Sequence, residues 1–157
     1  MRAVRDWVAV LAISALLFTL LSCGGSSTPS FHPVSNSTIA LLTSNGPAYV
    51  RIEVADTQTA WERGLMGRAE LADNAGMLFV FPSEKIHDFW MKDTLIPLDM
   101  LFFNSDLKLV NIKHNAPSCK EDPCPTFGSE KSSQYVLEVK SGWAKEHGIK
   151  LGDQLQR

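Results

Sequence analysis

The chain lacks any run of basic residues, and its 157 residues carry a formal net charge of -2. Proteins that bind nucleic acid usually neutralise phosphates with clustered lysines and arginines, so the sequence argues against a nucleic-acid partner. It also lacks a glycine-rich phosphate-binding loop, and no serine stands in a Gly-x-Ser-x-Gly motif. These absences remove the commonest sequence signs of nucleotide binding and of serine hydrolase chemistry.

Metal-ligating side chains are present, but they are not grouped. His87 and His114 lie far apart in the sequence, and no histidine or methionine has a second ligand at the short spacing typical of a metal site. The methionines at positions 66, 77, 91 and 100 are of the number expected in an ordinary hydrophobic core. We therefore predict no metal and no cofactor.

The N-terminal residues 1–22 differ in composition from the rest of the chain. Two arginines are followed at residues 7–21 by an apolar run that has the length of a signal-peptide core and is short for a membrane span. The run ends in LLSC at residues 20–23, which resembles the lipobox of bacterial lipoproteins, where the cysteine carries a lipid. We therefore predict a lipoprotein signal peptide and lipidation at Cys23.

This interpretation predicts an exported protein whose N-terminal lipid anchors it to a membrane of the cell envelope. Gly24 rather than Asp follows Cys23, which favours an outer membrane facing the periplasm where the bacterium has one. The alternatives are an uncleaved membrane anchor and an ordinary secretory cleavage nearby, and both place the domain outside the cytoplasm. Residues 23–38 are rich in Gly, Ser, Thr and Pro, which is typical of a flexible tether. A single domain is expected over residues 39–157.

Short apolar or alternating segments separated by turn signals predict a mainly β domain. We expect strands at residues 39–42, 48–55, 76–81, 84–92, 98–103, 107–113, 134–140 and 149–155, the middle ones forming an antiparallel meander. One short helix should begin at Thr59, which has capping-box spacing to Glu62, and a second after Ser141, ending at Gly148. The pattern is typical of a compact antiparallel β sandwich or barrel with one or two short helices.

Cysteine is scarce, with three in the whole chain. Once Cys23 is assigned to lipid, Cys119 and Cys124 remain, and in an oxidising compartment such a pair should form a disulfide. A redox-active pair is the alternative. The four residues between the two cysteines, rather than the two of thioredoxin-like motifs, favour a structural bond.

The stretch at residues 87–103 places a few polar side chains in the most hydrophobic segment that follows the signal peptide. Asp99 lies in an otherwise apolar strand, where a carboxylate needs hydrogen-bond donors or a cation, for which Lys92, Arg68 or amides near residues 93–94 are suitable. The carboxylate is expected either to fix strand register or to bind a ligand. The candidate ligand-binding residues are Arg68, His87, Trp90, Lys92 and Asp99, and no catalytic residue is assigned.

Several motifs occur in an order that resembles one family. They are RGLMGR at residues 63–68, GMLFVF at 76–81, FWMKDT at 89–94, IPLD at 96–99, CP at 124–125, VLEV at 136–139, GWA at 142–144 and HGI at 147–149. Over roughly residues 48–155 the chain resembles the bacterial and archaeal domain of unknown function 192 family. The resemblance implies a compact, mostly antiparallel β domain that is often exported, and it implies no biochemical activity. Asp93 departs from the family pattern, which more often has Asn there.

Together these features predict a membrane-tethered extracytoplasmic binding module. A groove beside residues 87–99 would bind a small polar ligand, an envelope polymer or another envelope protein. The alternatives are an extracytoplasmic, hydrolase-like enzyme that uses His87 and Asp99, and a purely structural envelope lipoprotein.

Overall fold

The computed structural model describes residues 37–157, so the predicted signal peptide, Cys23 and most of the predicted tether lie outside the described residues. The strands are β1 (Ser37–Thr43), β2 (Gly46–Ala55), β3 (Ala75–Lys85), β4 (Asp88–Trp90), β5 (Leu98–Phe103), β6 (Leu109–Ala116), β7 (Thr126–Gly128), β8 (Ser133–Lys140) and β9 (Gln154–Gln156), and the helices are α1 (Gln58–Arg63) and α2 (Trp143–Glu146). Neither helix within this part of the chain is long and apolar enough to cross a membrane.

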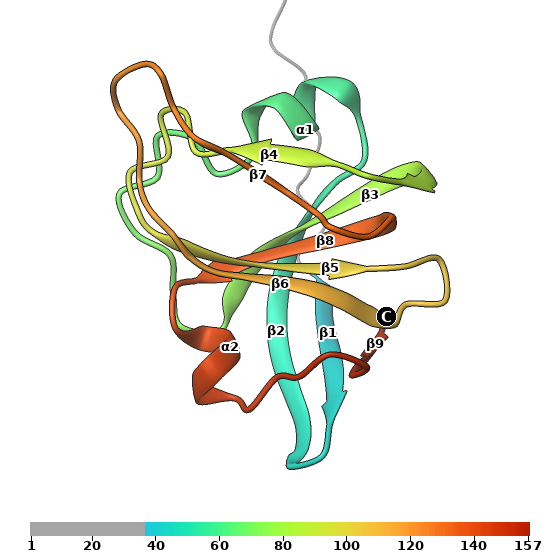
Figure 1. The fold of residues 1–157 in the computed structure, drawn as a ribbon. Helices are drawn as coiled ribbons and strands as arrows, with labels where there is room; N and C mark the ends of the chain where they lie inside the picture. The colour runs from blue at the N-terminus through green and yellow to red at the C-terminus, as the bar shows by residue number, and fades with distance from the viewer. Residues whose placement is uncertain (1–36) are drawn as a thin grey trace, which may run out of the picture. The chain divides into compact units, whose positions relative to one another are not determined.

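Seven strands form one curled sheet in the order β6-β5-β8-β3-β2-β1-β9 (Figure 1). Neighbouring strands are antiparallel except β2 and β3, which run parallel because the chain crosses back through α1 between them. The two edges of the sheet meet at one end, where Leu109 N donates to Asp153 O at 2.8 Å and Leu155 N donates to Leu107 O at 2.9 Å. The predicted mainly β fold with two short helices is confirmed, in the form of a half-barrel.

The order of the middle strands differs from the predicted meander. β8 lies between β3 and β5, and Leu137 is paired with both Leu78 and Leu101. The predicted strand at residues 84–92 is divided, since its first residues end β3 and only β4 follows, paired with β7 in a separate two-stranded sheet. The reason is burial. β8 is apolar enough to be covered on both faces, whereas the segment after Pro82 exposes polar side chains and cannot lie at the centre of a sheet.

The main sheet buries both of its faces, each against a different cluster of side chains. The inner cluster, inside the curl, includes Leu41, Val50, Leu78, Leu101 and Leu137. The outer cluster includes Phe79, Phe89, Met91, Met100, Phe102 and Val136 and is covered by α1 and the small β4-β7 sheet, which Figure 1 shows over one end of the main sheet. The side chains of Val136 and Glu138 on β8 therefore lie beneath α1 and β4.

The ends of the helices depart from the predicted caps. Thr57, not Thr59, caps α1 by accepting a hydrogen bond from Ala60 N at 3.3 Å. The helix ends at Gly64, where a φ of 45° suits glycine. The last predicted strand is shortened to β9, because residues 150–153 form turns instead.

Candidate functional site

Asp99 is buried in β5, and backbone amides satisfy its carboxylate. Its Oδ1 accepts a hydrogen bond from Asn115 N at 2.9 Å, and its Oδ2 accepts from Gly142 N at 3.0 Å and Ala144 N at 3.1 Å. The latter two amides begin α2, so Asp99 caps this helix in the place predicted for Ser141. Asp99 does need donors, but the prediction that Lys92, Arg68 or the turn at residues 93–94 supplies them is wrong, because α2 and the end of β6 lie closer.

Arg68 forms an ion pair with Glu53 on β2. Its Nη1 donates to Glu53 Oε1 at 2.5 Å, and its Nη2 contacts Oε2, so the pair is bidentate. The hydrogen bond from Arg68 lowers the pKa of Glu53, which stays ionised. The guanidinium group predicted to bind a ligand is therefore engaged by a carboxylate of the protein itself.

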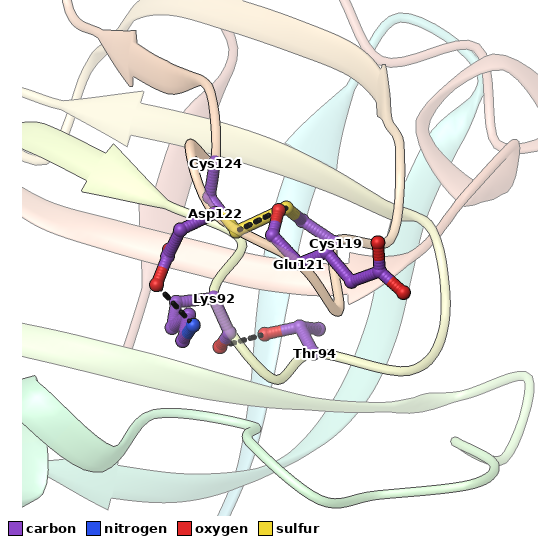
Figure 2. Close-up of a disulfide and its surroundings, with 6 residues drawn as sticks. All are labelled: Lys92, Thr94, Cys119, Glu121, Asp122 and Cys124. Atoms are coloured by element: carbon purple, nitrogen blue, oxygen red, sulfur yellow. Dashed lines mark hydrogen bonds and ion pairs between the residues drawn. A yellow bond between two sulfur atoms is a disulfide. The ribbon is translucent and has the colours of Figure 1, made fainter.

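Lys92 lies beside the predicted disulfide, which is present. Cys119 and Cys124 are joined, and Cys119 N donates to Thr94 O at 3.3 Å, so the disulfide loop is attached to the segment that follows β4 (Figure 2). Lys92 Nζ donates to Asp122 Oδ2 at 2.6 Å within the same group of residues. Lys92 thus holds this loop in place and does not line a cavity with the other predicted residues.

His87 and Trp90 are the two predicted residues that the fold brings together. They line an open groove of about 520 Å³ between α1 and the β3-β4 segment. The residues that line the groove are Gln58, Trp61, Glu62, Phe79, Phe81, Pro82, Lys85, Ile86, His87, Asp88, Phe89 and Trp90. We call it the aromatic groove, because six of these twelve side chains carry an aromatic ring.

Ring contacts fix the shape of the aromatic groove. The Trp61 ring lies 5.0 Å from that of Phe81, which stacks on His87 at 3.7 Å between ring centres. Trp61 Nε1 donates to Ala55 O at 2.9 Å, which holds the indole of α1 against the end of β2. Trp90 contributes an indole that is 52% exposed, a large fraction for so apolar a side chain. The groove therefore offers preformed ring surfaces to solvent.

The imidazole of His87 is uncharged at neutral pH. Burial lowers its pKa, and the charge of Lys85 lowers it further. Its Nε2 is buried without a hydrogen-bond partner among residues 37–157. No hydrogen bond or ion pair joins His87 to Asp99, and the two line different pockets, so the described part of the chain holds no His87-Asp99 dyad.

Glu138 is a candidate site residue that the sequence analysis missed. It lies on β8 between Met77 and Met100, is 4% exposed, and forms no hydrogen bond or ion pair with any residue from 37 to 157. Burial raises its pKa to about 8, so the carboxyl group is protonated at neutral pH. A buried and unpaired acid of this kind is a frequent mark of a functional site.

Glu138 lines a small recess of about 30 Å³. The recess and the aromatic groove share Trp61, Glu62, Phe79, Phe89 and Trp90, so the two cavities adjoin. Together they form one composite site, with aromatic rings in the outer groove and the buried acid Glu138 in the recess.

The sequence did contain a signal for Glu138. It interrupts an apolar strand just as Asp99 does, within VLEV at residues 136–139. The alternation of β8 by itself places Val136 and Glu138 on the face opposite the core, so the pattern does not mark Glu138 as buried. In the structure both faces of β8 are buried, so this opposite face is also interior. No group of three or more His, Cys, Asp or Glu side chains in residues 37–157 is arranged to bind a metal.

Similarity to known proteins agrees with this fold. Residues 40–157 match the model of the DUF192 family, which is described as an uncharacterised ACR. The chain is 33% identical to a protein of unknown function from Novosphingobium aromaticivorans DSM 12444, with a TM-score of 0.73 over 84% of this chain and 94% of the other. It is 34% identical to a protein from Sinorhizobium meliloti 1021 described as a candidate transcription regulator, with a TM-score of 0.71 over 80% of this chain and 97% of the other.

No curated protein matches the chain. The family match extends over most of its length and includes β2 to β9, most of β1 and both helices. The chain therefore belongs to the DUF192 family.

Proposed function

We propose that this protein is a binding module of the cell envelope, held at a membrane by a lipid on Cys23, and that it binds a small polar ligand or an exposed part of an envelope polymer. The aromatic groove, open to solvent and adjoining an unpaired buried acid, is the observation that carries the proposal. Ligand sites are typically concave and mostly apolar, with a few polar groups that fix the orientation of the ligand.

The lining of the groove favours a ligand with a flat apolar face and polar edges. Trp61, Phe81 and Trp90 present ring surfaces on which such a face can stack. The polar side chains at the margin are Gln58, Glu62, Lys85 and Asp88, which supply both donors and acceptors. A ring-shaped or extended polar molecule meets both requirements, whereas a purely apolar one would leave the margin unpaired.

An extracytoplasmic location is supported from two sides. The lipobox-like LLSC at residues 20–23 predicts export and anchoring, and the disulfide between Cys119 and Cys124 is of a kind that persists in oxidising compartments. The tether at residues 23–38 would let the domain reach ligands near the membrane surface.

A ligand screen on the intact purified protein tests the proposal. Thermal shift with small polar metabolites and envelope oligosaccharides should find ligands that raise the melting temperature, because a ligand stabilises the folded state to which it binds. Trp90→Ala should weaken their binding by tenfold or more, since exposed tryptophans often dominate binding free energy. Tyr49→Ala is the matched control, because Tyr49 is 60% exposed on β2 and does not line the groove. Ligands that bind the Trp90 variant as tightly as the wild type would refute the proposal.

A further inference from the structure

The acid inside the recess has no hydrogen-bond or ion-pair partner among residues 37–157. Glu138 is flanked on the neighbouring strands by Met77 and Met100, and neither can donate a hydrogen bond. Native proteins rarely leave a buried polar side chain unpaired unless a water, an ion or a ligand completes the site. The recess is therefore a place where an incoming group can meet an otherwise unsatisfied carboxyl group.

The size of the recess limits what can enter. A volume of about 30 Å³ admits one group of roughly the size of a water molecule. A primary ammonium group has this size, whereas a trimethylammonium group is too large. The rest of the ligand would have to lie in the adjoining aromatic groove.

The rings around the recess favour a cation. Trp61, Phe79, Phe89 and Trp90 all line it, and the faces of aromatic rings attract a positive charge, those of tryptophan most strongly. Phe79 and Phe89 meet edge to face, with ring centres 5.1 Å apart. An ammonium group inside the recess would be close to several rings at once.

No side chain of the described chain neutralises Glu138. Glu62 and Arg63 of α1 line the recess, but Arg63 forms no ion pair with Glu138. The facing positions on β3 and β5 are methionines, β4 contributes Phe89 and Trp90, and the nearby loop contributes Thr94. Farther out, the groove is lined by the charges of Lys85 and Asp88 and by His87, which is neutral. In residues 37–157 no cation pairs with Glu138, so a cation that pairs with its carboxylate would come from the ligand.

We propose that the recess binds a primary ammonium group of the ligand against the Glu138 carboxylate, with the carbon skeleton of the ligand lying along the aromatic groove. This inference rests on the proposed function and names the chemical class of the ligand. The protonated Glu138 of the empty site gives its proton to solvent as the ammonium group enters, so that a carboxylate-ammonium pair replaces a neutral carboxyl group. One proton is released for each ligand bound well below the pKa of about 8.

Titration calorimetry of the intact protein with n-butylammonium, at several pH values and in buffers of different ionisation enthalpy, tests this exchange. Affinity should rise about tenfold from pH 6 to pH 7 and level off above pH 8, with nearly one proton released at pH 6. n-Butanol, which has the same chain and no charge, should bind more weakly and release no proton. Failure of n-butylammonium to bind, or binding without proton release, would overturn the proposal.

Variants assign the effect to Glu138. Glu138→Gln should lower the affinity for n-butylammonium at pH 8 by tenfold or more and abolish proton release. Glu130→Gln, at an exposed acid outside the composite site, should change neither quantity. Thermal unfolding of each variant shows whether it is folded, and unchanged n-butanol binding by Glu138→Gln shows an intact groove. Unaltered n-butylammonium binding by a folded Glu138 variant contradicts the ammonium site.

Two further pairs of probes identify the skeleton that carries the ammonium group. Glucosamine is compared with N-acetylglucosamine, and Nα-acetyl-lysine amide with Nα-acetyl-norleucine amide, because only the first member of each pair carries a primary ammonium group. Tighter binding of the charged member of either pair supports the site and indicates its natural source, and equal binding within both pairs refutes it. If ligand binding is weakened by Trp90→Ala but does not depend on a positive charge, the proposed groove function is supported and the ammonium site is refuted. If ligand binding is unchanged by Trp90→Ala, the groove function itself is refuted.

Discussion

Glu138 and Asp99 are both carboxylic acids buried in apolar strands, yet their surroundings give them opposite roles. Asp99 accepts three hydrogen bonds from backbone amides and fixes the start of α2. Glu138 accepts none in the described chain, and its pKa rises to about 8. The number of donors within reach, rather than burial itself, decides which acid is structural and which is available for binding.

The stability of the protein should depend on the protonation of Glu138. In the unfolded chain its pKa is near the ordinary value of 4.5, and in the folded protein it is about 8. Between these two pH values the folded state holds a proton that the unfolded state has lost. The free energy of unfolding should therefore be highest below pH 4.5 and should fall as pH rises toward 8, by up to about 1.4 kcal/mol per pH unit. Glu138→Gln cannot lose this proton and should give a flatter profile. Urea unfolding of both proteins between pH 5 and pH 8 measures the difference, and parallel profiles would contradict the raised pKa.

Asp99 should be far more important for stability than Ser141, although the sequence favours Ser141 as the helix cap. Asp99→Ala leaves three backbone amides without their acceptor and should lower the free energy of unfolding by roughly 3 kcal/mol or more. Ser141→Ala removes only a hydrogen bond to the side chain of Asn115 and should lower it by less than about 1 kcal/mol. Denaturant unfolding compares the two variants, and the reverse order of effects would show that Ser141 is the effective cap.

Among the structural elements, the strands of the main sheet show what sequence patterns can and cannot predict. Alternation and turn residues predicted strands at residues 48–55, 98–103 and 134–140 correctly, because these signals act along the chain. The position of β8 between β3 and β5 could not be predicted in this way, because it depends on pairing between segments far apart in the sequence. For the same reason the candidate ligand-binding residues divide among an ion pair, a helix cap, the disulfide loop and the aromatic groove.

The disulfide loop is an element whose contribution can be measured. Cys119 and Cys124 are 5 residues apart, and a loop this short restricts the unfolded chain enough for about 2 kcal/mol of stability. The Cys119→Ser/Cys124→Ser variant should lose about that much in urea unfolding. Because the loop contacts Lys92 and Thr94, hydrogen exchange should accelerate there first, while the amides of β8 remain protected. Equal acceleration in β8 would instead show that the loop supports the main sheet.

For the whole molecule, lipidation of Cys23 is the prediction that decides its place in the cell. Mass spectrometry of the mature protein should find an N-terminal Cys23 that carries acyl chains, since LLSC at residues 20–23 resembles a lipobox. The Cys23→Ala variant should leave the membrane fraction and appear in the soluble fraction, because the variant lacks the acyl chains that hold a lipoprotein on a bilayer. Cys119→Ser/Cys124→Ser is the control that leaves Cys23 intact. A mature protein that begins after residue 23, or that carries no lipid, would contradict the prediction.

The pairing of β9 with β1, where the two sheet edges meet, bears on aggregation of the protein. An uncovered strand edge is a template on which a second chain can add, and this is how β-rich proteins form aggregates. β9 occupies the outer edge of β1 with only three residues, and the turn before it contacts the start of β6. Loss of the last four residues would uncover β1, the strand through which the N-terminal segment joins the domain. The short C-terminal strand therefore covers an edge of β1 on which a second copy of the chain could otherwise add.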